Sequence, residues 1–138
     1  MKGADALHKG ERKAILQSVE SLLEKYRLCK YLIPEDGQSI RSNHDIGSLE
    51  KHRSFCRKIE QAVSQLPDRE QFLIKERYLG INTDYITDYR VYRDRFDPPI
   101  SEGTYTKIRW RAMYRLSVLL GLTEYHKTMK RMIEHGKS

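Results

Sequence analysis

The segment spanning residues 66–122 contains three successive helix signals, and turn-forming residues separate each one from the next. The first helix is predicted to start at Pro67-Asp68, where Asp68 provides the N-cap and Gln71 completes a capping-box spacing. Gly80 stands where a left-handed residue would end that helix. Helices interrupted this often by caps and breakers must pack on one another, so the chain is predicted to be all-α.

A shorter helix is predicted after a linker at residues 82–86. Thr87 or Asp84 provides its N-cap, and its apolar positions continue to Phe96. Asp97-Pro98-Pro99 ends this helix, because proline has a fixed φ and no backbone N–H to donate.

The last helix of the segment is predicted to run from Glu102 to about Leu120, between an N-cap at Ser101 and a stop signal at Gly121. A helical projection gives it an apolar stripe made of Tyr105, Ile108, Ala112, Leu116 and Leu119. Its far side carries Gly103, Lys107, Trp110, Arg111 and Tyr114, with Thr104 and Arg115 at the edge. A short helix, a turn and a longer helix in this order are typical of a helix-turn-helix.

Two long helices are predicted before this segment, from Glu11 to Ile33 and from Ser48 to about Gln65, joined by a polar loop at residues 34–47. Their apolar seams repeat in steps of four and three: Ile15, Val19, Leu22, Tyr26, Cys29 and Ile33, then Leu49, His52, Cys56, Ile59, Val63 and Leu66. Matching seams favour either an antiparallel hairpin within one chain or pairing between two subunits. After the helix-turn-helix, a last amphipathic segment carries Leu122, Tyr125, Met129, Met132 and Ile133.

The charge of the chain favours an acidic partner such as nucleic acid. The formal net charge is +7, and residues 101–116 hold four basic side chains and one acidic one, 4 − 1 = +3. No stretch approaches the ~18–20 apolar residues that span a membrane, and residues 1–30 lack the apolar run of a signal peptide. Two cysteines make no disulfide framework, so a cytoplasmic protein without membrane association is expected.

The outward residues of the last helix are the candidate DNA contacts, because the N-terminal half of such a helix enters the major groove. The base-reading candidates are Glu102, Thr104, Lys107 and Arg111. Lysine and arginine pair with the acceptors of guanine, and threonine contacts a base or the thymine methyl group. The residues expected to meet phosphates are Arg109 and Arg115, at the sides of the helix, with Arg90 and Arg93 of the preceding helix.

The aromatic residues have competing interpretations. The tyrosines Tyr85, Tyr89 and Tyr92, interleaved with arginines, would suit a stacking surface for single-stranded nucleic acid. The helical spacing of Tyr89, Tyr92 and Phe96 instead favours a packed face of the support helix. Trp110 and Tyr114 are likewise favoured as a packing pair, and exposed lysines and arginines on a helix are often only solvated.

Neither a metal, a cofactor nor a catalytic residue is expected. Cys29, His44, His52 and Cys56 would supply a zinc ligand set, but no short pairing supports it and both cysteines lie on apolar seams. The chain has no glycine-rich phosphate loop, nucleophile elbow or HExxH motif, so it is not expected to be an enzyme.

The segment 66–79, followed by TDYRVYRDRF, ISEGTYTKIRWRAMYRLS and LLGL, resembles the ArpU/RinA-type phage transcriptional regulators. The C-terminal half of that family resembles region 4 of bacterial sigma factors. LEKYRLCKYLIPE at residues 23–35 is similar to the family's N-terminal helix, so the resemblance covers most of residues 23–122. It implies a protein of phages or prophages of Gram-positive bacteria that controls late genes for packaging and lysis.

The resemblance also implies roles for two helices. Thr87–Phe96 corresponds to the support helix and Ser101–Leu120 to the recognition helix, whose DNA-facing start carries Thr104, Tyr105, Lys107, Arg109 and Arg111. The expected architecture is an N-terminal helix and polar loop at residues 1–47, a sigma-region-4-like helix-turn-helix domain at 48–122, and an amphipathic tail at 123–138. The first two helices would form the N-terminal hairpin.

The expected function is sequence-specific binding of double-stranded DNA that regulates, by activation, the transcription of late genes in the bacterial host cytoplasm. Two alternatives stay open: a small DNA-packaging component such as a terminase small subunit, and an adaptor that binds RNA polymerase. RNA polymerase and a second copy of the chain, in a homodimer, therefore stay open as partners.

Overall fold

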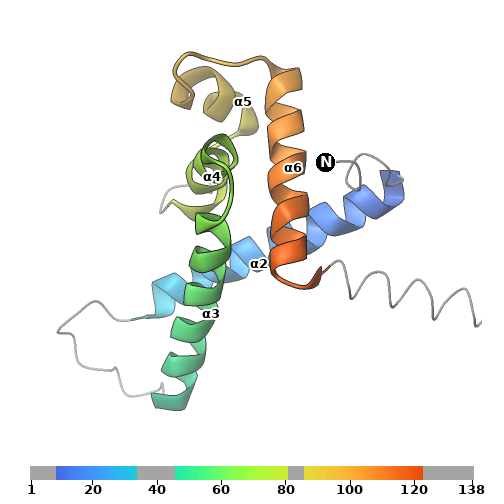
Figure 1. Cartoon of the computed structure of the whole chain (residues 1–138). Coiled ribbons are helices and arrows are strands. Elements are labelled where there is room, and N and C mark those ends of the chain that lie inside the picture. The colour runs from blue at the N-terminus through green and yellow to red at the C-terminus, as the bar shows by residue number, and fades with distance from the viewer. Residues whose placement is uncertain (1–8, 34–45, 81–85, 123–138) are drawn as a thin grey trace, which may run out of the picture.

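The structure is a computed structural model that describes residues 9–33, 46–80 and 86–122 (Figure 1). Its helices are, in chain order and with η marking a π-helical turn, α2 (Lys9–Leu32), α3 (Ile46–Ser64), α4 (Asp68–Ile74), η1 (Lys75–Leu79), α5 (Asp88–Arg90), η3 (Val91–Arg95) and α6 (Glu102–Leu119). These ranges contain no strand, and the prediction of an all-α fold is confirmed. None of their helices combines the length and the apolar character needed to cross a bilayer. The predicted loop and C-terminal tail fall largely or wholly outside these ranges.

The two N-terminal helices pack on each other within the chain, and α2 also crosses α6 (Figure 1). The Tyr26 hydroxyl of α2 donates to Glu60 of α3 at 3.1 Å, and the Cys29 thiol lies 3.5 Å from His52 Nδ1. Most of the predicted seam residues are buried: Ile15, Val19, Tyr26, Cys29, Leu49, Cys56, Ile59, Val63 and Leu66. The matching apolar seams therefore meet inside one molecule.

The helix after Leu66 differs in detail from the prediction at both of its ends. Pro67 occupies the N-cap position and no side chain caps the helix, so the predicted cap by Asp68 is wrong. At the other end α4 widens into the π-helical turn η1, and Gly80 follows with φ −73° and ψ 157°. The chain leaves this turn in an extended conformation, so the predicted left-handed residue at Gly80 is also wrong.

The caps of the last two helices match the sequence. Thr87 Oγ1 accepts a hydrogen bond from the Arg90 N–H at 3.2 Å, and Ser101 Oγ accepts from the Thr104 N–H at 3.1 Å. Each of these side chains satisfies a backbone donor that the first helical turn leaves unpaired. Gly121, at φ 78°, follows the end of α6 in the left-handed region, as its predicted role as a stop signal requires.

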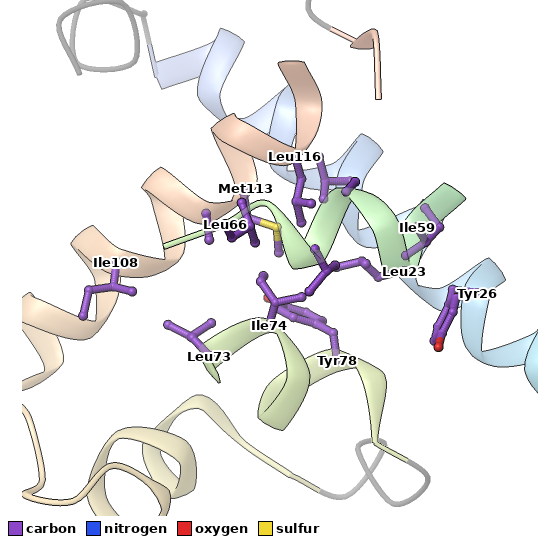
Figure 2. Close-up of a cluster of buried hydrophobic side chains, with 14 of the residues drawn as sticks. Leu23, Tyr26, Ile59, Leu66, Leu73, Ile74, Tyr78, Ile108, Met113 and Leu116 are labelled. Atoms are coloured by element: carbon purple, nitrogen blue, oxygen red, sulfur yellow. The ribbon is translucent and has the colours of Figure 1, made fainter. Parts of the chain in front are cut away.

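One hydrophobic core joins the N-terminal helices α2 and α3 to the later helices α4 and α6 (Figure 2). Leu23 of α2, Ile59 of α3, Ile74 of α4 and Leu116 of α6 contribute to it, and each is at most 1% exposed. Because α6 lies against both α4 and α2, Tyr105, Ile108, Ala112 and Leu116 of its predicted apolar stripe are buried, whereas Leu119 is 41% exposed and its predicted place in the stripe is wrong. This packing determines which side of α6 faces the solvent.

Candidate nucleic-acid interface

The N-terminal half of α6 presents a polar and basic surface to solvent. Gly103, Thr104, Lys107 and Arg111 are all exposed, and we call these four residues the outward face of α6. Glu102 is exposed beside them. This arrangement leaves the cationic ends of Lys107 and Arg111, one helical turn apart, open to a ligand.

Two details suit this surface to close contact with a ligand. The Ser101 hydroxyl donates to Thr104 Oγ1 at 3.0 Å, so the Thr104 hydroxyl keeps its own proton for an external acceptor. A Cβ placed on Gly103 would meet nothing within 4 Å, so internal packing does not require glycine at that position. The first turn of α6 thus offers a ligand two groups: the Thr104 hydroxyl, which is oriented by Ser101, and the Gly103 backbone, which no side chain covers.

Arg109, a predicted phosphate contact, lies on another side of α6 and is used inside the protein. Its Nε donates to the Tyr78 hydroxyl at 2.8 Å, and its Nη2 pairs with Glu20 of α2. Burial disfavours the charged guanidinium, but Tyr78, Asp88 and Glu20 outweigh that effect and raise the pKa of Arg109. The charge of Arg109 is therefore largely compensated within the fold.

Tyr105 is 2% exposed, although the resemblance places it at the DNA-facing start of the recognition helix. Its hydroxyl donates to Asp88 Oδ1 at 2.6 Å, and Arg77 Nε donates to the same oxygen at 2.9 Å. Burial raises the pKa of Asp88, but the Tyr105 hydrogen bond and the charges of Arg109 and Arg77 outweigh burial and lower it. Burial and Asp88 together raise the pKa of Tyr105, which stays protonated as a donor.

The lowered pKa of Asp88 predicts how stability changes with pH. A carboxyl with a depressed pKa stabilises the folded state above its unfolded value of about 3.9, and that contribution is lost as the pH falls through the folded-state pKa. Asp88→Asn removes this charge and should therefore reduce the free energy of unfolding at pH 7. We expect a loss on the order of 1 kcal/mol, since the carboxylate is partly exposed and solvent screens its interactions. The difference between the two proteins should shrink below pH ~4. Urea unfolding at several pH values measures it, and a constant difference would contradict the electrostatic role.

Arg115, the other predicted phosphate contact on α6, forms an ion pair with Glu70 of α4. Its Nε lies 3.0 Å from Glu70 Oε1, although the N–H direction falls outside hydrogen-bond geometry. Burial raises the pKa of Glu70, while Arg115 and Arg111 partly oppose that shift. The Arg115 side chain remains 40% exposed, so a ligand on this side can still reach it.

Trp110 and Tyr114 pack inside the structure, as predicted. Trp110 is buried, its ring lies 5.8 Å from that of Tyr114, and the guanidinium of Arg12 from α2 sits 5.2 Å from the Trp110 ring centroid. Such a cation–π contact adds to the packing of α2 against α6. These aromatic residues belong to the helix–helix interface.

The short helical segment formed by α5 and η3 contributes further exposed cations. Arg90 and Arg93 are exposed, and the Arg93 guanidinium lies 5.6 Å from the ring centroid of Tyr89. Phe96 is buried and Tyr92 half-buried, as a packed face requires. The Tyr89 ring lies edge-on to that of Tyr92 at 5.5 Å, but Tyr89 is 52% exposed, so its predicted place on the core face is wrong.

The cysteines and histidines of the described residues do not assemble a metal site. Cys29, Cys56 and His52 come from facing helices, but the described residues contain no group of three potential ligands placed to bind one ion. Both thiols are buried, and burial, with a smaller contribution from Cys29, raises the pKa of Cys56. His44, the fourth residue of the conceivable zinc set, lies outside the described residues.

Sequence patterns missed the acidic residues that hold α6. Glu20 was one of many charged positions on α2, and Asp88 follows the Thr87 cap, where an acidic residue suits the helix dipole in any protein. The available signal was the i, i+4 spacing of Tyr105 and Arg109, which places their side chains on one side of α6. Comparison of the chain with protein-family models, with curated proteins and with solved structures finds no match.

Proposed function

We propose that the protein binds duplex DNA in a sequence-guided manner, with α5 and η3 as the support helix and α6 as the recognition helix of a helix-turn-helix. The observation that carries the proposal is the outward face of α6, which is exposed, basic and rooted on a buried apolar stripe. Two of the four basic side chains in residues 101–116, Arg109 and Arg115, have internal partners. Lys107 and Arg111 supply the exposed cations.

In this proposal the outward face enters the major groove. Lys107 and Arg111 donate to the acceptor atoms of guanine, and Glu102 accepts from a cytosine amino group. Thr104 donates to a base or a phosphate, and the bare backbone at Gly103 allows the helix start to approach the duplex. Arg90 and Arg93 on the support helix neutralise phosphates and fix the register.

The resemblance to phage late-gene regulators extends the proposal to a biological role. Binding next to a promoter would activate the transcription of phage or prophage genes for packaging and lysis. The basic outward face favours this role over an adaptor that holds RNA polymerase with little DNA contact, because an adaptor does not require exposed cations on the recognition helix.

Selective binding to a library of labelled prophage fragments tests the proposed function. We expect one or a few fragments to shift in an electrophoretic assay at moderate salt, with an affinity that falls as salt rises because bound phosphates release counterions. Equal affinity for all fragments would contradict sequence-guided binding. The mass in solution separates the alternatives, since a packaging ring would contain many subunits and a regulator one or two.

A further inference from the structure

We infer that Glu20 of α2 and Asp88 of α5 are positioning residues for the recognition helix: Glu20 pairs with Arg109, and Asp88 accepts a hydrogen bond from Tyr105. Arg109 then helps to position the helix and does not contact a phosphate. The inference rests on the proposed function and adds a mechanism to it. The five residues Glu20, Tyr78, Asp88, Tyr105 and Arg109 are called the two-carboxylate anchor below.

The anchor contacts α6 at two successive turns. Tyr105 reaches Asp88, which follows the Thr87 cap of the support helix, while Arg109 reaches Glu20 near the middle of α2. Tyr78 of η1 adds to the second contact: its hydroxyl accepts from Arg109 at 2.8 Å and donates to Glu20 Oε1 at 3.4 Å. Three separate elements therefore hold one side of the same helix.

Two grips on one side of a helix fix its rotation as well as its position. The hydrophobic stripe contributes the bulk of the packing, but apolar contacts are not directional. Hydrogen bonds are directional, since they weaken steeply away from linear geometry. A side-chain tip lies about 5–6 Å from the helix axis, so a rotation of roughly 20° would move it by about 2 Å. That displacement breaks a hydrogen bond to a base edge.

The anchor residues lie away from the outward face. Tyr105 is buried, and the Arg109 side chain is 24% exposed and contacts Tyr78 and Glu20 within the protein. Lys107, between them in sequence, is exposed on the other side of the helix. The positive charge of Arg109 is compensated by the Glu20 carboxylate within the protein. Arg109 is therefore not expected to neutralise a DNA phosphate and release a counterion. This distinguishes a positioning role from a phosphate contact.

The salt dependence of binding separates the two roles. Affinities of wild type, Arg109→Met and Arg90→Met are measured for a selected fragment and for a random duplex over a series of KCl concentrations. For Arg109→Met we expect the preference for the selected fragment to fall about tenfold, comparable to one mismatched base pair, with an unchanged salt slope. For Arg90→Met, an exposed arginine on the support helix, we expect the slope to fall by about 0.9 with little change in preference.

The outcomes separate the inference from the proposed function. A loss of slope in Arg109→Met, or an unchanged preference, overturns the positioning role while DNA binding stands. A wild-type protein without any preference overturns the proposed function, and the inference with it. Circular dichroism and thermal unfolding confirm that each variant is folded. If Arg109→Met fails to fold, Tyr105→Phe removes the hydrogen bond to Asp88 without changing the charge or the buried ring, and is measured in the same way, with the same expected loss of preference and unchanged slope.

Discussion

Arg111→Ala should weaken binding to a selected DNA fragment by about 1–3 kcal/mol if the side chain makes a bidentate contact to guanine. Arg111 is exposed on the outward face of α6 and is not needed to fill the core, so the loss would come from the interface and not from the fold. The measurement is an equilibrium titration at fixed salt, with the selected fragment and with fragments altered one base pair at a time. Specificity should relax at one position of the site.

Arg57→Ala provides the matched control for this prediction. Arg57 is an exposed arginine on α3, so its replacement removes the same charge and the same side chain outside α5, η3 and α6. We expect a small and uniform effect on all fragments. An Arg111→Ala protein that binds as tightly as wild type would show that Arg111 is a solvated surface residue and would leave Lys107 as the cation to test.

Leu116→Ala should reduce the free energy of unfolding by about 2–5 kcal/mol, which is a large fraction of the stability of a small domain. Leu116 of α6 is fully buried within the core cluster shown in Figure 2. Removing its branched end takes apolar surface out of the packed interior and leaves a cavity, because the neighbouring helices relax only partially. Urea unfolding followed by circular dichroism measures the loss.

Leu119→Ala is the control, since it makes the same substitution three residues further along α6. The Leu119 side chain is 41% exposed, although the sequence placed it in the apolar stripe with Leu116. We expect a change within about 0.5 kcal/mol, typical of surface substitutions. Equal losses for the two variants would mean that the end of α6 is covered in solution, for example by a second copy of the chain.

The features predicted well from the sequence are those that depend on neighbouring residues. The Ser101 and Thr87 caps, and Gly121 beyond the end of α6, each act within one helical turn, so local chemistry determines them. The apolar seams of α2 and α3 follow from helical periodicity for the same reason. Gly80 shows the limit of local rules, because a π-helical turn just before it changed the direction in which the chain leaves the helix.

The roles of the basic residues on α6 depend on distant partners. Lys107 and Arg109 are two residues apart and chemically similar, and a helical projection cannot tell which of them has an internal partner. The carboxylate that pairs with Arg109 belongs to Glu20, 89 positions earlier in the chain. Tyr105 presents the same difficulty, since it is both on the apolar stripe and hydrogen-bonded to Asp88. Only the packing of α2 and α5 against α6 separates these residues from the outward face.

The crossing of α2 over α6 has a consequence for how this gene can change. Ile15, Val19 and Leu23 of α2 complete the same core as α6, and Glu20 of α2 pairs with Arg109. A recombination event that transferred only residues 48–122 to another gene would leave out the α2 side chains of the core and the carboxylate partner of Arg109. Inheritance of the first helix together with the last is therefore expected, and substitutions at Glu20 and Arg109 should be compensated in pairs as related sequences diverge.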